Sequence, residues 1–218
     1  MIQPVMLLNL AFFSILANAC APIPIPQQAS LVPAGEDRMG LSGALVLPLE
    51  ANTRWTPDGE LTPTASARQP DLQYTPLPSA TGWIRRGTGW GETQVAVSMP
   101  SFLITVATKV GLVGLSPESS FSLALSAEAN AAPITASLSV GSTLLSSVSL
   151  GRGITMDMGV RVGNFTGIWQ GLTVTPTVGM TLPLQGDKQF HIGIGCTLPT
   201  ATGDSTYAAW LQAGATFR

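Results

Sequence analysis

The side chains that could carry out chemistry in this chain are few and widely spaced. His191 is the only histidine, and it stands alone among apolar and small residues. A histidine in such a setting is usually a hydrogen-bonded interior group. No grouping of His, Cys, Asp and Glu has the spacing of metal ligands, and the run from Gly87 to Gly91 (GTGWG) falls short of a dinucleotide fingerprint. The sequence therefore predicts no metal, no cofactor and no catalytic residue.

The other ionisable side chains of interest fall on the polar faces of predicted strands. They are Glu92, Lys109, Glu128, Asp157, Arg161 and one of the adjacent pair Arg85 and Arg86, and His191 lies on the same kind of face. Because both signs are present, we expect a cross-strand network in which the charges neutralise one another. The alternative is a narrow polar pore or a small-ligand pocket whose selectivity these charges set.

Strands must position these residues, because alternation with a period of two dominates the chain after residue 38. Between Leu172 and Leu182, Leu, Val, Pro and Met at even positions alternate with Thr and Gly at odd positions, and the segment from Phe190 to Leu198 repeats the pattern. The same alternation predicts ten strands, at 39–49, 80–87, 91–99, 101–113, 118–129, 133–150, 153–163, 170–184, 188–199 and 206–217. The pattern is weakest over 80–87, and without that strand or its neighbour there would be eight.

The composition decides what the two faces of these strands meet. Only 10% of the residues are charged, against about 25% in soluble domains. A β-sandwich would expose its polar faces to water, but here those faces carry mostly Thr, Ser, Gly and Ala. A lumen of small and hydroxylated residues within a lipid-facing wall fits better, and a sheet in lipid must close. We therefore expect an all-β, antiparallel up-and-down transmembrane β-barrel; the net charge of −2 gives no case for nucleic acid.

The connections and the last strand point to one class of barrel. Short turns at 87–91, 114–117, 151–153 and 185–188 would lie at the periplasmic end, and longer connections at 50–79, 164–169 and 199–205 at the other. From residue 39 onward the chain resembles the bacterial outer-membrane β-barrel proteins, and residues 207–218, with Phe217 near the end, resemble their carboxy-terminal assembly signal. The resemblance implies outer-membrane lipid and the barrel-assembly machinery as partners. Outer-membrane lipid A deacylases carry a His-x-Ser pair on a strand, but Gly193 stands where that serine would follow His191.

The amino terminus resembles a lipoprotein signal. An apolar run over residues 5–19 ends in Leu16-Ala-Asn-Ala-Cys20, similar to the bacterial lipobox. The resemblance implies a signal peptide (1–19), a lipidated Cys20 opening a Pro-rich tether (20–38) in which residues 21–26 act as a stiff spacer, and a barrel domain (39–218). An ordinary cleaved signal is the alternative. A disulfide between Cys20 and Cys196 is a less favoured use of the two cysteines.

The function expected from the sequence is that of a non-enzymatic outer-membrane β-barrel lipoprotein with a structural or surface-interaction role, in which residues 50–79 form the contact surface. The alternative is a narrow channel or small-solute transporter. A lipid-modifying barrel enzyme and a soluble β-sandwich are less favoured, and the sequence predicts no oligomeric state.

Overall fold

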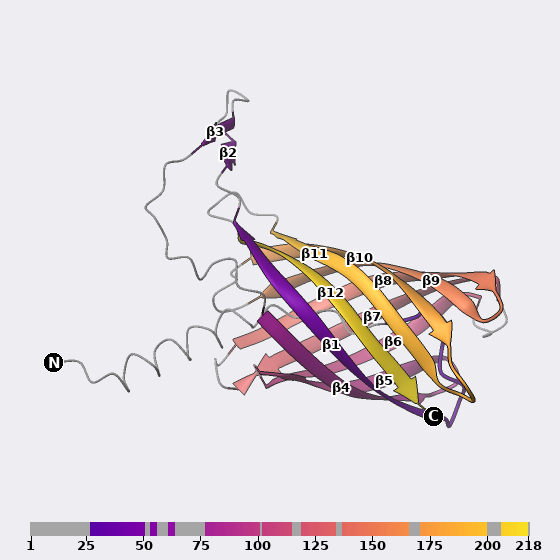
Figure 1. The fold of residues 1–218 in the computed structure, drawn as a ribbon. Coiled ribbons are helices and arrows are strands. Elements are labelled where there is room, and N and C mark those ends of the chain that lie inside the picture. Colours follow the sequence, from indigo (N-terminus) through magenta and orange to yellow (C-terminus); the bar gives the residue numbers. More distant parts are fainter. Residues whose placement is uncertain are drawn as a thin grey trace.

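Ten strands form one closed antiparallel barrel (Figure 1). The computed structural model describes residues 27–50, 53–55, 61–63, 77–100, 102–114, 119–133, 137–165, 171–199 and 206–217. The barrel strands are β1 (Asp37–Glu50), β4 (Leu77–Gly87), β5 (Gly91–Met99), β6 (Leu103–Val113), β7 (Phe121–Ala132), β8 (Ser137–Gly151), β9 (Ile154–Phe165), β10 (Gly171–Pro183), β11 (Gln189–Pro199) and β12 (Thr206–Phe217). Each strand pairs with its neighbours in chain order, and β1 pairs with both β12 and β4 to close the sheet.

The fold class predicted from the sequence is confirmed, and most strand boundaries agree within a few residues. The eight-strand alternative is wrong, because the weakest prediction, 80–87, corresponds to β4, an 11-residue strand paired on both sides. The predicted strand 133–150 begins later than expected. Pro133 lies before β8, consistent with its lack of a backbone N–H for the ladder.

The two ends of the barrel differ in their connections. At the end where β1 begins, β8 joins β9 through Gly151, Arg152 and Gly153, all in the left-handed region with φ of 89°, 53° and 76°. Glycine adopts this conformation without steric cost, which explains the tight turn. The opposite end carries the long connection from β1 to β4, within which β2 (Thr53–Trp55) and β3 (Leu61–Pro63) form a two-stranded sheet (Figure 1).

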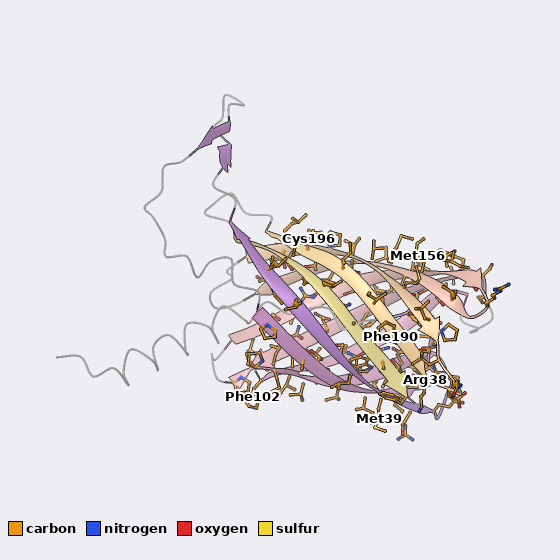
Figure 2. All side chains as sticks on the ribbon, in the orientation of Figure 1. Arg38, Met39, Phe102, Met156, Phe190 and Cys196 are labelled. Carbon is orange, nitrogen blue, oxygen red and sulfur yellow. The ribbon has the colours of Figure 1, made fainter. Side chains whose placement is uncertain are left out.

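The outer wall of the barrel is apolar. Alternate residues of every strand point outward, and those of large apolar type remain exposed, as do Leu41 (60%), Val140 (62%) and Ile194 (59%). Phe102 lies at one end of the barrel and Phe190 near the other, while Cys196, which is not in a disulfide, lies on the wall between (Figure 2). Within the described part of the chain, no helix is long and apolar enough to span a bilayer.

The inner face is polar, with the parity that the sequence predicts. In β10 the threonines at 173, 175 and 181 are almost completely buried, while the apolar residues between them face outward. A sheet with an apolar exterior and a buried polar interior is inverted relative to a soluble domain, and this is the arrangement expected of a barrel in lipid.

The segment before β1 lies inside the barrel. Residues 37–38 are already part of β1, and residues 27–36 run along the lumen to the end where β1 begins, where the Gly35 N–H donates to the carbonyl of Gly87 at 3.0 Å. Ala29 is only 2% exposed and Val32 7%. The part of the predicted tether that follows Pro26 is therefore a lumenal segment up to residue 36, and the stiff spacer expected at 21–26 lies outside the described residues. Cys20 and the signal peptide lie outside the described residues.

We expect Leu144→Arg, in the middle of β8, to lower the free energy of unfolding in lipid vesicles by about 2–4 kcal/mol, because it places a charge at the bilayer midplane. Leu150→Arg, near the end of the same strand, is the matched control and should cost about 0–1 kcal/mol. Both leucines are exposed on the outer wall. Urea titrations measure the difference; equal effects at the two positions would mean that the wall does not face a membrane.

Candidate functional site

A deeply buried ion pair of the lumen joins neighbouring strands β5 and β6. The Nζ of Lys109 lies 2.8 Å from Oε1 of Glu92, and the two side chains are 3% and 2% exposed. These residues are also a registered pair in the ladder, so the strands hold them opposite each other. Removing one partner of such a pair typically costs about 3–5 kcal/mol, because the other charge is left uncompensated.

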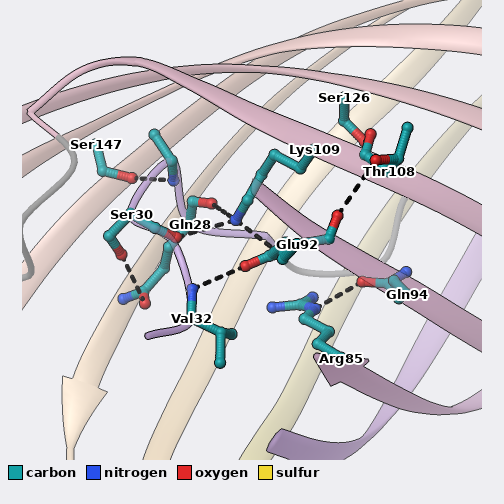
Figure 3. Close-up of polar contacts among 11 residues, drawn as sticks. Gln28, Ser30, Val32, Arg85, Glu92, Gln94, Thr108, Lys109, Ser126 and Ser147 are labelled. Atoms are coloured by element: carbon teal, nitrogen blue, oxygen red, sulfur yellow. Dashed lines mark hydrogen bonds and ion pairs between the residues drawn. The ribbon is translucent and has the colours of Figure 1, made fainter. Parts of the chain in front are cut away.

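A second cation lies beside this pair on β4. The Nε of Arg85 donates to Oε1 of Gln94 at 2.6 Å (Figure 3). The guanidinium carbon of Arg85 lies 5.5 Å from the centre of the Trp83 ring. The aromatic face adds a favourable electrostatic contact to the hydrogen bond. Arg85 is thereby held against the wall near the Lys109–Glu92 pair.

The second buried ion pair lies on β7 and β9. The Nε of Arg161 donates to Oε1 of Glu128 at 2.5 Å, and the Nδ2 of Asn130 donates to the same oxygen at 3.2 Å. Arg161 is only 1% exposed. Its guanidinium rests on two glycines of adjacent strands: a Cβ at Gly141 would lie 2.7 Å from Nη2, and one at Gly163 would lie 2.5 Å from Nη1. The buried arginine therefore depends on the absence of side chains beneath it.

A chain of hydrogen bonds crosses five consecutive strands from β8 to β12. The Oγ of Ser147 donates to Asp157 at 2.6 Å, the Oγ1 of Thr181 donates to the other carboxylate oxygen at 2.5 Å, and His191 contacts Thr181 through Nδ1 at 2.9 Å and Thr216 through Nε2 at 2.7 Å. Because an ionised carboxylate only accepts, the hydroxyl of Thr181 must accept from Nδ1–H. The Nε2 of His191 then accepts from Thr216, so both ring nitrogens are engaged.

A small cavity of about 40 Å³ adjoins this chain in the lumen. Gln27, Glu128, Asp157, His191 and Gln212 are among its lining residues. The space admits only a few water-sized groups. Among the described residues, no group of three or more His, Cys, Asp and Glu side chains is arranged to hold a metal.

Side chains of the barrel wall form hydrogen bonds with main-chain atoms of the lumenal segment (Figure 3). The Nζ of Lys109 donates to the carbonyl oxygens of Gln28 at 2.8 Å and Ser30 at 2.9 Å. The N–H of Val32 donates to Oε2 of Glu92 at 3.0 Å. A further main-chain N–H, that of Ala29, donates to Oγ of Ser147 at 2.8 Å, which joins the segment to the chain that ends at Thr216.

Not all of the predicted charged residues face the lumen in the structure. Glu92, Lys109, Glu128, Asp157, Arg161 and His191 all face the lumen, and of the adjacent arginines only Arg85 does. Arg86 points outward, where its side chain is 66% exposed and its Nε lies 3.9 Å from Asp37. The reason is the pleat, which turns consecutive residues to opposite faces. Arg86 is therefore not part of the network.

Several residues of the site were not predicted from the sequence. Arg38 belongs to the inner face of β1, and Gln94 and Asn130 complete the polar contacts of the charged residues. Gly40 and Gly195 make room for the rings of Trp83 and Trp210, as two other glycines do for Arg161. The sequence does contain a signal for such positions: a glycine on the polar face of a strand indicates that a bulky group approaches the backbone there.

The fold and the lumen together define a closed, ten-stranded antiparallel barrel of the architecture found in bacterial outer membranes. No protein-family model matches the chain, and no curated protein matches it in sequence. Among solved structures, it is similar to an outer membrane channel from Pseudomonas putida F1, with a TM-score of 0.53 and 9% identity over 89% of this chain and 100% of the other. It also matches Ail, the attachment invasion locus protein of Yersinia pestis, solved with the heparin analogue sucrose octasulfate, with a TM-score of 0.31 and 12% identity over 84% of this chain and 99% of the other.

We expect Gly141→Ala to destabilise the protein by about 1–3 kcal/mol, because the added methyl overlaps the guanidinium of Arg161. Gly43→Ala is the matched control. A Cβ at Gly43 would meet only the carbonyl of Ser79 at 3.7 Å, so this change should be neutral or slightly stabilising. Urea titrations of the two variants give the comparison, and equal stabilities would contradict the role assigned to Gly141.

Proposed function

We propose that this protein is a non-catalytic β-barrel of the bacterial outer membrane whose lumen is a narrow conduit for small polar solutes, closed in the conformation described. The observation that carries the proposal is the combination of an apolar outer wall with a polar lumen that holds a stretch of main chain. A barrel of eight strands is just wide enough for its own side chains to fill. This barrel has ten, and residues 27–36 share the interior with the wall side chains.

Two further observations support a conduit. The lumen is lined by hydroxyl, amide and charged groups of both signs, which can replace part of the hydration of a small polar solute. The solved structure from Pseudomonas putida F1 that shares this fold is described as an outer membrane channel. The two ring nitrogens of His191 are both engaged and Gly193 follows at the position of the missing serine, which supports a non-catalytic role.

A structural or surface-interaction role is the second candidate. It is favoured by the long connection between β1 and β4, which forms the two-stranded β2–β3 sheet in addition to the barrel. Such a connection offers a contact surface outside the bilayer. In this role the lumen would remain permanently closed.

Conductance through planar bilayers tests the conduit. We expect the purified protein to need detergent, to change gel mobility on heating and to pass a small current. Asp157→Asn should shift the reversal potential under a salt gradient, because it removes a negative charge from the lumen. Asp187→Asn, in the exposed turn after β10, is the control and should leave the potential unchanged. A folded, inserted barrel that never conducts would leave the surface role as the function.

We further propose that Cys20 carries the lipid anchor implied by the lipobox resemblance. The acyl chains of a lipoprotein contribute about 0.8 kcal/mol per buried methylene. Because the barrel also holds itself in the bilayer, Cys20→Ser should slow processing and abolish fatty-acid labelling, yet leave folded barrel in the membrane. Metabolic labelling decides the matter: unlabelled wild-type protein, cut elsewhere than before Cys20, would contradict the assignment.

A further inference from the structure

The contacts that hold the lumenal segment have one chemical property in common. Lys109, Glu92 and Ser147 contact carbonyl oxygens and N–H groups of the segment, and every one of the four contacts is made to main-chain atoms (Figure 3). The cation donates to two carbonyls, and the carboxylate accepts from one N–H. The segment bends at Ala29 and Ser30, and the main chain of another peptide with the same bend presents the same donors and acceptors.

Two side chains of the segment are buried in the lumen, those of Ala29 and Val32 (7% exposed). Ala29 is 2% exposed and packs against Ala124 and Leu145, which leaves no space for a larger side chain. The segment also packs directly against Gly87 of the wall where it leaves the lumen. A Cβ at this position would overlap the carbonyl oxygens of Val32 and Pro33. The wall therefore has a groove that contacts a peptide main chain and encloses a small side chain at position 29 and a valine side chain at position 32.

The groups of the wall remain partnered when the segment is absent. Lys109 and Glu92 pair with each other at 2.8 Å, and Ser147 donates to Asp157. When the segment leaves, each charge of the ion pair therefore keeps its counter-charge. A buried charge left without a counter-charge is what makes the loss of a partner costly, and that does not arise here. The segment itself exchanges its contacts for water. An occupant held in this way can be exchanged.

We propose that the groove formed by Lys109, Glu92 and Ser147 is a binding site for a short, bent peptide main chain, occupied in this conformation by residues 27–32 of the same chain and able to accept a peptide supplied in trans. The lumen is closed when a peptide occupies the groove, and it opens when the peptide leaves. The opening, unlike the binding, rests on the proposed function as a membrane-spanning conduit.

Amide hydrogen exchange in the full-length protein in detergent tests the hold on the segment. Lys109→Met combined with Glu92→Gln removes both charges together, so that neither is left uncompensated. The N–H of Val32 should then exchange about tenfold faster or more, since it loses its hydrogen bond to a charged group. Asp37→Asn combined with Arg86→Gln removes the exposed ion pair of the outer wall and serves as the control. Unchanged exchange at Val32 in the lumenal variant would overturn the proposal.

Binding in trans tests the site itself. A variant lacking residues 27–33, shown to be folded by heat-modifiable mobility, should bind the labelled peptide QQASLVP in detergent, as measured by fluorescence anisotropy. A peptide with Thr and Val in place of Gln28 and Ser30 should bind equally, whereas Ala29→Trp should weaken binding about tenfold or more, because the ring does not fit. In bilayers the same variant should conduct more than the intact protein until QQASLVP is added.

The arms of the experiment separate the two proposals. Absence of peptide binding to the folded deletion variant overturns the groove, whether or not the barrel conducts. Binding without any current supports the groove and overturns the conduit. If the deletion variant does not fold, the exchange rate of Val32 in the full-length protein decides on the groove by itself.

Discussion

The pairing of β1 with β12 is the interaction on which the rest of the structure depends. Hydrocarbon offers no partner to a backbone N–H or C=O, so a sheet placed there must satisfy every such group within itself. The register from Met39 opposite Phe217 to Glu50 opposite Thr206 joins the first and last strands and removes the two edges. Closure fixes the tilt and the lumen width, and through these it decides which inward side chains meet.

The charged side chains of the lumen also need partners within the barrel. These groups are removed from bulk water, so each must find a counter-charge or a hydrogen-bonding partner nearby. The wall supplies these from adjacent strands, as between Lys109 and Glu92, or across β8, as between Arg161 and Glu128. Glycines at Gly141 and Gly163 supply the space that the larger group needs. The interior is therefore determined by the register as much as by residue type.

This dependence on register explains what could be predicted from the sequence. Alternation located the strands, their faces and most of the inward charges, because parity is a local property of the chain. Gly141 could not be assigned to Arg161, since it comes from another stretch of sequence and only the register of β8 with β9 brings the two together, whereas Gly163 lies two residues from Arg161 on the same face of β9. The segment before β1 was predicted only as part of a Pro-rich tether, because its position in the lumen depends on the long-range contacts of Lys109 and Ser147.

The segment inside the barrel constrains the order of events during insertion into the membrane. Residues 27–36 precede β1, and the last strand to be synthesised closes the wall around them. A chain that had already sealed its seam could receive the segment only lengthwise through an end. While β12 is still unpaired, the segment can enter sideways and gather β5, β6 and β8 through Glu92, Lys109 and Ser147. The lumenal segment and the inner faces of these strands, which do not contact lipid, would then be the first parts of the barrel to become ordered.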